Sequence, residues 1–147
     1  MQVASAFLCD AASVREGLLH VLGGGITRLW RQEFPAPLGV SIALLLELHR
    51  QELDRPHELN IIIMGEDGQQ IAEVKGGFQA PASPTLELHE GQLIPMTLDL
   101  GGAELPAAGA YTVDISIDGE HRRSLHFSAR PASELLEQQR QHQPPAG

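Results

Sequence analysis

The sequence is poor in cysteine and in basic residues. Its 147 residues include a single cysteine, Cys9, which rules out an internal disulfide. A lone thiol is typical of proteins in a reducing compartment, so we expect a cytoplasmic location. The chain has 10 Lys and Arg against 19 Asp and Glu, for a net charge of -9. Because phosphate groups are bound by clustered Lys and Arg, we expect neither nucleic acid nor an anionic membrane as a partner.

Apolar runs are short and aromatic residues are few. No apolar run reaches the roughly 18 residues that a membrane-spanning helix needs. The N-terminal MQVASAFLCD lacks the basic segment of a secretory signal, so we expect no cleaved leader. Aromatic residues make up 4% of the chain. The length suits one domain, which we expect at residues 1–131, followed by a tail at 132–147 that is a short helix or disordered.

Alternation of apolar and polar residues predicts strands in the middle of the chain. In GVSIALLLELH, residues 39–49, the aliphatic side chains recur at every second position. LNIIIM, residues 59–64, is apolar on both faces, which is typical of a buried central strand. About eight short strands separated by turns, with few helices, predict an all-β fold, an immunoglobulin-like antiparallel β-sandwich of about 7–9 strands.

Residues 110–130 predict a hairpin around Asp118-Gly119. A strict two-residue loop would pair Val113 with Ser124 and would place the apolar side chains of the two strands on opposite faces. We therefore expect a loop of odd length, a bulge-type turn with Gly119 at a positive φ.

Just before this hairpin, LPAAGAY ends at Tyr111. A leucine, a tight Pro/Gly turn and a tyrosine that opens a strand resemble the tyrosine corner of Greek-key sandwiches. We expect Tyr111 to be structural, with its ring in the core and its hydroxyl bonded to the backbone of the turn.

Three consecutive glycines, residues 23–25, raise the question of a phosphate site. A Walker loop needs Lys and then Ser or Thr after its last glycine, where this chain has Ile26 and Thr27. A dinucleotide fingerprint needs a further glycine where Arg28 stands. We therefore interpret the three glycines as structural.

The segment before the glycines leaves two alternatives open. Asp10 could cap a helix over residues 11–22 that ends at Gly23. Alternatively, residues 18–22 form a strand and the glycines form a bend or bulge. Local pattern does not separate the two, because short apolar runs suit both.

Four stretches, which together cover nearly everything from residue 2 to about residue 130, resemble one family. They are LCDAASVREGLLHVLGGGITRLW, FPAPLGVSIALLLELH, RPHELNIIIMGEDGQQIAEVKGGF and LPAAGAYTVDISIDGEHRRSLHF. The chain resembles an uncharacterised bacterial family, mainly actinobacterial, described as a domain of unknown function. The resemblance favours a strand over residues 17–29 and implies no catalytic residue.

Two copies of LELH place a glutamate two positions before a histidine, Glu47 with His49 and Glu87 with His89. If both pairs lay on neighbouring strands, the four side chains could surround a Zn²⁺ ion. Alternatively, both pairs face solvent on half-buried strands. No close His-x-x-x-His or Cys-x-x-Cys pair accompanies them, so we expect neither a metal nor another cofactor.

Cys9, Asp10 and His20 offer a nucleophile, an orienting carboxylate and a base. No local signature of a catalytic triad accompanies them, and a lone cysteine is most often a packing residue. We therefore expect no catalytic residue among them.

Two further groups are candidate contacts with another protein. The aromatic pair Trp30 and Phe34 could form an exposed contact or could close one end of the sandwich. Arg122 and Arg123, flanked by two histidines, could bind an anionic partner or could be a solvated strand edge. The flanking histidines are His121 and His126.

These observations favour a non-catalytic binding or assembly module. We expect its partner to be a protein that the sequence does not identify, and the interpretation leaves room for a homodimer. The alternative is a small metal- or ligand-dependent enzyme that uses the Glu/His pairs on the strands.

Overall fold

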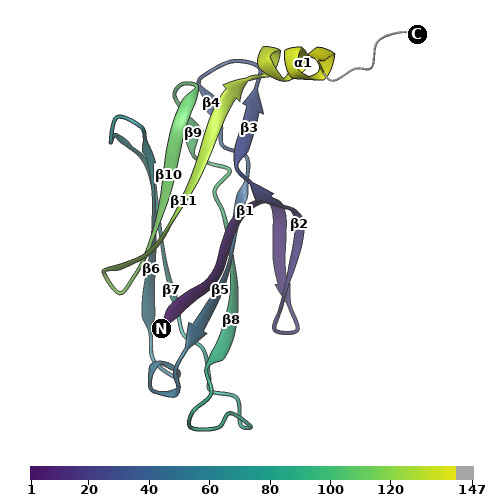
Figure 1. Ribbon diagram of the computed structural model, residues 1–147. Coiled ribbons are helices and arrows are strands. Elements are labelled where there is room, and N and C mark those ends of the chain that lie inside the picture. The colour runs from purple at the N-terminus through teal and green to yellow at the C-terminus, as the bar shows by residue number, and fades with distance from the viewer. Residues whose placement is uncertain (142–147) are drawn as a thin grey trace, which may run out of the picture.

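The computed structural model describes residues 1–141, which are mostly strands (Figure 1). The longer strands are β1 (Gln2–Arg15), β2 (Leu18–Ile26), β3 (Arg28–Arg31), β5 (Ser41–Leu48), β6 (His57–Gly65), β7 (Gln70–Phe78), β8 (Gln92–Asp99), β10 (Gly109–Ile117) and β11 (Glu120–Pro131). Two short strands, β4 (Ala36–Pro37) and β9 (Glu104–Leu105), pair with each other. The helices are the short 3-10 helix η1 (Arg50–Glu52) and α1 (Ala132–Gln141). Neither of these described helices is long and apolar enough to cross a membrane.

The longer strands form two sheets. One sheet has the strand order β2-β1-β5-β8, and all its neighbours are antiparallel. The other has the order β3-β11-β10-β6-β7, in which β3 runs parallel to β11 and the other pairs are antiparallel. The all-β class that the alternation predicts is therefore confirmed.

Side chains from both sheets form one hydrophobic core. On β5, Ile42, Leu44 and Leu46 are fully buried. On β10, every second side chain from Tyr111 to Ile117 is buried, because successive side chains of a strand point to opposite faces. β6 lies inside its sheet between β10 and β7, which is the central position that the apolar sequence LNIIIM predicts.

The turn of the β10–β11 hairpin corrects one sequence prediction. Ile117 pairs with Glu120, so Asp118-Gly119 is a two-residue turn, and the expected loop of odd length is wrong. Both turn residues have positive φ, 53° at Asp118 and 81° at Gly119. Two positive φ angles give the turn a twist that matches the twist of the flanking strands.

The extra residue that we expected in the turn lies instead inside β11. The register of the hairpin shifts between Ile115 and Ser116, which leaves Arg122 as a bulge on the opposite strand. As a result Val113 pairs with Leu125 and not with a serine. The apolar side chains of the two strands therefore share a face, as the burial of the core requires.

Two other segments decide or correct the sequence interpretation. Residues 11–22 belong to β1 and β2 and the turn between them, so the strand alternative is right and the helix alternative is wrong. Residues 86–89, the second LELH, lie in the loop between β7 and β8, so the expected strand is wrong there. No strand pairs with this segment in the described part of the chain, and alternation alone does not supply a pairing partner.

The last strand ends at Pro131, and α1 begins at the next residue, Ala132. No residue of α1 is buried, although the helix contacts β3 and β11. Of the expected tail, residues 132–147, the described part forms this short helix, and the alternative of disorder at residues 142–147 falls outside the described residues.

Candidate interaction surface

The most prominent surface feature is the outer part of the β1–β2 hairpin, residues 10–23, which we call the arm. Along β1, pairing with β5 ends at Cys9, and the residues after it pair with β2 alone. No side chain of the arm is buried or packs against the hydrophobic core. In Figure 1 the arm stands apart from the body of the molecule. An isolated two-stranded hairpin is at best marginally stable in water, so the arm is suited to packing against something else.

The three glycines lie at the base of the arm. Leu8 pairs with Ile26 and Cys9 pairs with Gly24, so Gly25 is an extra, bulged residue with φ of +90°. A bulge bends its strand and increases the local twist, which directs the arm away from the body. Gly23 has φ of +63°, and a Cβ atom there would overlap the Asp10 carboxylate, so a larger residue would be strained at this position. These glycines shape a strand and open no helix, in contrast to the phosphate loops considered above.

Both faces of the arm carry apolar side chains. Residues that pair across antiparallel strands lie on the same face. On one face Leu18 and Leu22 of β2 are 63% and 72% exposed. The other face carries the apolar pairs Ala12–Val21 and Val14–Leu19, with Asp10 beside Gly23 at the base of the arm.

β2 is also an edge strand, with one side of its backbone unpaired. Proteins normally protect such edges with charged residues or proline, because an open edge can pair with another chain. Among the edges of the two main sheets, β7 carries Lys75, β8 carries Pro95, and β3 has only four residues, two of them arginines. Residues 17–27, which include all of β2, contain no Asp, Glu, Lys, Arg or Pro. Within the arm β1 also has an open edge, since its pairing with β5 ends at Cys9, but this part of β1 carries Asp10 and Arg15. β2 is therefore the open edge without a charged residue or proline in the described part of the chain.

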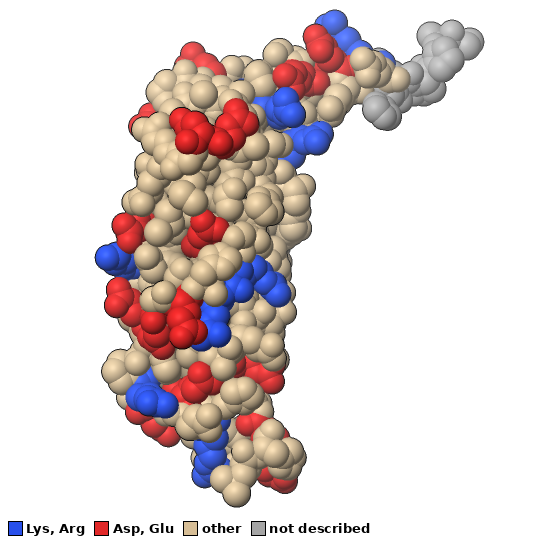
Figure 2. Space-filling view, turned by 60° about the vertical axis from the view of Figure 1, so that its left-hand side comes forward, with Lys and Arg blue, Asp and Glu red and all other residues tan. Residues whose placement is uncertain are grey.

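Unlike β2, the body of the molecule carries many charged side chains. Figure 2 shows acidic side chains spread over the face that comes forward from the left of Figure 1, with fewer basic ones between them. Since the chain has a net charge of -9, the uncharged β2 contrasts with an acidic body.

The first residue of β6 is a buried histidine, His57, that the sequence analysis did not single out. His57 is 8% exposed and stacks on Phe78, with ring centroids 5.3 Å apart. Its Nδ1 lies 2.7 Å from Asp118 Oδ2, and its Nε2 lies 2.6 Å from the carbonyl oxygen of Glu52. Asp118 also accepts a hydrogen bond from the backbone N–H of Glu58. The contact joins residues 61 positions apart, and no local pattern predicts it.

Both partners of the His57 ring accept hydrogen bonds. Two such bonds need a hydrogen on each ring nitrogen, so the imidazolium form fits the site. Burial by itself lowers the pKa of His57, but the bonds to the Glu52 carbonyl and the Asp118 carboxylate outweigh it and raise the pKa above the usual value. The bond from His57 and the backbone N–H of Glu58 lower the pKa of Asp118.

The N-terminus and Arg122 extend this cluster. The amino group of Met1 lies 2.8 Å from Glu52 Oε1. Burial alone would raise the pKa of Glu52, but this ion pair and a backbone hydrogen bond from His49 lower it. Arg122 donates a hydrogen bond to the carbonyl of Met1 and forms an ion pair with Glu120. The candidate contact residue Arg122 is therefore engaged within the chain.

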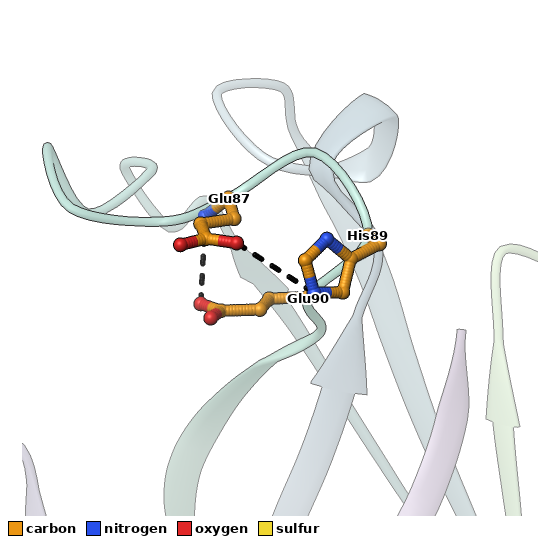
Figure 3. Close-up of side chains that lie close together, drawn as sticks. All are labelled: Glu87, His89 and Glu90. Carbon is orange, nitrogen blue, oxygen red and sulfur yellow. Dashed lines mark hydrogen bonds and ion pairs between the residues drawn. The ribbon is translucent and has the colours of Figure 1, made fainter.

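The two LELH sequences do not form the four-residue metal site that we considered. Among the described residues, the group of side chains that could hold an ion is Glu87, His89 and Glu90 (Figure 3). Their ligand atoms lie within 4.8 Å of one another, and all three residues are exposed. Glu47 and His49 lie outside this group, since Glu47 accepts a hydrogen bond from the Gln2 side chain and His49 precedes η1.

Cys9 and His20 do not meet in the structure. Cys9 pairs with Gly24, whereas His20 pairs with Ser13, four positions further along β1. The Cys9 thiol is buried and donates a hydrogen bond to the carbonyl of Ser41. Burial raises the pKa of this thiol and the nearby Asp10 carboxylate raises it further, which disfavours the reactive thiolate.

The structure also places the remaining residues that the sequence singled out. Trp30 is half-buried on β3, and Phe34 is half-buried against the core. Arg123 is half-buried on β11. Tyr111 is buried and stacks on Phe127, and its hydroxyl donates a hydrogen bond to the carbonyl of Ala107.

Residues 4–130 match a family of unknown function, DUF6941. The chain belongs to this family. The match covers both main sheets and the arm, and it ends one residue before the last residue of β11. This match confirms the expected membership of a family described as a domain of unknown function, and no chemistry is assigned to DUF6941. No curated protein matches the chain.

Proposed function

We propose that the chain is a non-catalytic binding or assembly module that contacts a protein through the arm. The observation that carries this proposal is the open edge of β2. This strand has no charged residue, one side of its backbone is unpaired, and its own Leu18 and Leu22 are exposed on an arm outside the core. An open strand edge binds another chain through backbone hydrogen bonds, and side chains on alternate positions provide selectivity. Exposed apolar side chains that gather on one element are typical of protein contacts.

Two properties of the chain support a protein as the partner. The net charge of -9 opposes nucleic acids and anionic membrane surfaces, both of which attract basic proteins. The free, buried Cys9 fits the cytoplasmic location that we propose. The proposed bacterial, mainly actinobacterial, origin rests on the resemblance of the four sequence stretches alone.

We further propose that the two sheets form an immunoglobulin-like sandwich. A shared core between the sheets supports this description. The Tyr111 hydroxyl bonded to Ala107, four residues upstream, supports it as well, since a tyrosine corner is a feature of such folds.

Affinity purification from the native cells tests the binding proposal. We expect the wild-type chain to retain proteins that the double variant Leu18→Glu/Leu22→Glu loses. Leu88→Glu is the matched control, because Leu88 is 83% exposed but lies in the β7–β8 loop. Equal sets of proteins from all three chains would contradict a role for the arm.

The second candidate function, a metal-dependent enzyme, is favoured by the cluster of Glu87, His89 and Glu90. Carboxylate oxygens and imidazole nitrogens are ligands of zinc. A thermal-shift series with Zn²⁺, Mn²⁺ and Ca²⁺ tests this candidate, with His89→Ala as the control. Stabilisation by micromolar ion that disappears in His89→Ala would support it, because a ligand that binds the folded state raises the melting temperature. The binding proposal predicts no such stabilisation.

A further inference from the structure

We propose that the partner of β2 is β2 of a second copy of this chain, paired antiparallel about a two-fold axis at His20. This inference rests on the proposed function and names its partner. It joins the two sheets that contain β2 into one continuous sheet of eight strands, in the order β8-β5-β1-β2 and then the reverse in the second copy.

The sequence of β2 is self-complementary in this register. The stretch LLHVL, residues 18–22, reads apolar, apolar, His, apolar, apolar in both directions. With His20 opposite His20 of the second copy, Leu18 faces Leu22 and Leu19 faces Val21. Paired side chains share a face, so each exposed leucine meets a leucine, and Leu19 and Val21 meet on the opposite face. One step further out, Gly17 at the tip faces Gly23, where no side chain obstructs the approach.

For two copies of this acidic chain, electrostatics favours contact at the β2 edge over contact at any other part of the surface. Two copies carry a net charge of -9 each, so they repel wherever their acidic surfaces meet. The contact between β2 strands involves residues 17–23, none of which is Asp, Glu, Lys or Arg. The pairing therefore places no like charges directly opposite each other.

The other sheet edges also favour a closed dimer. If β2 paired with a different edge of the second copy, the contact would leave another β2 free and could continue into a filament. Those edges are blocked by Lys75 on β7 and by Pro95 on β8, and β3 is short and basic. A two-fold β2 contact uses the uncharged edges of both copies. The open edge of β1 within the arm carries Asp10 and Arg15, so every edge that remains has a charged residue or proline and the assembly stops at two copies.

Charge variants of Leu18 and Leu22 test the register in the full chain. Sedimentation velocity over a range of micromolar concentrations should show a reversible wild-type dimer. In Leu18→Glu/Leu22→Glu and in Leu18→Lys/Leu22→Lys, each contact faces a like charge, and we expect the dissociation constant to rise at least about tenfold. In Leu18→Glu/Leu22→Lys, each Glu faces a Lys of the second copy, so the dimer should form again despite the same loss of apolar surface.

Each outcome of this series decides the proposal. A monomeric wild type overturns it, and so does a dimer that all three double variants retain or all three lose. If the wild type is monomeric but the arm variant still loses proteins in the affinity purification, the arm binds a different protein and only the dimer is wrong. If the arm variant loses nothing there and the wild type is monomeric, the proposed function fails as well.

Discussion

At the scale of single residues, two buried polar side chains connect the start of a strand to a turn. Tyr111 reaches from the start of β10 to the backbone of the preceding turn at Ala107. His57 joins the start of β6 to the β10–β11 turn at Asp118. Each satisfies its hydrogen bonds inside the protein, because a buried polar group without a partner would be destabilising.

Tyr111→Phe keeps the ring on Phe127 and removes the hydroxyl. We expect a loss of about 1 kcal/mol in the free energy of unfolding, the usual contribution of one such hydrogen bond. Tyr111→Ala also removes a buried ring and should cost about 3 kcal/mol or more. Urea unfolding of both variants checks these values. Wild-type stability in Tyr111→Ala would mean that the residue does not hold the fold together.

The bond between His57 and Asp118 makes stability depend on pH. Because the pKa of His57 is raised on folding, its contribution is complete below about pH 6.5, the ordinary histidine value, and is lost as pH rises through the folded value. Because the pKa of Asp118 is lowered, its contribution is present above about pH 4 and is lost as pH falls through the folded value. The pair therefore stabilises most between these two limits.

Asp118→Asn removes the charge, and asparagine tolerates the positive φ of the turn. Its single side-chain oxygen can keep the hydrogen bond from the backbone N–H of Glu58, but its NH2 group then faces His57 Nδ1, which suits the neutral imidazole and not the imidazolium. We expect the variant to be less stable than the wild type near pH 6. The difference in the free energy of unfolding should shrink as pH rises and His57 loses its proton. Groups that are the same in both proteins cancel in the comparison. A difference that stays constant from mildly acidic to alkaline pH would show that the pair is not ionic.

At the scale of elements, alternation predicts a strand well where one face is buried. β5 and β10 follow their sequence patterns because the core selects every second residue. The second LELH repeats the letters of β5 but has no strand beside it, and it forms a loop. The β10–β11 hairpin shows that the apolar pattern requires one extra residue but does not say where that residue lies. An extra residue at Arg122 in β11 has the same effect on the register as one in the Asp118-Gly119 turn.

The arm is an element that the sequence indicates only in part. Strand formation over residues 18–22 was one of two alternatives, whereas the separation of the arm from the body depends on the bulge at Gly25 and on pairing with β5 ending at Cys9. Those features arise from distant pairing, which a local pattern does not contain. The cluster around His57 was missed for the same reason.

Replacing residues 11–22 with a short turn tests whether the arm is independent of the fold. The arm contributes no buried side chain to the core, so we expect the free energy of unfolding to change by less than about 1 kcal/mol. Urea unfolding monitored by circular dichroism checks this, and the β signal of the body should persist. A loss of several kcal/mol would mean that the arm packs on the body.

At the scale of the whole molecule, an acidic all-β body carries one uncharged, unpaired strand edge. The composition indicates the acidic surface, and the family match over residues 4–130 includes both the body and the arm. The sequence analysis proposed Trp30, Phe34 and the two arginines as contacts, whereas the structure directs attention to β2. Exposed leucines become informative only when the structure shows that nothing of the described chain covers them.

Amide hydrogen exchange of β2 at increasing protein concentration tests the central claim most directly. In an antiparallel edge strand every second amide bonds to the neighbouring strand, and the amides between them point outward. If the edge of β2 binds a second copy, the outward amides of residues 18–22 should become protected as concentration rises, while those of the edge strand β7 stay unchanged. Outward amides of β2 that exchange at the same fast rate at every concentration would contradict the account.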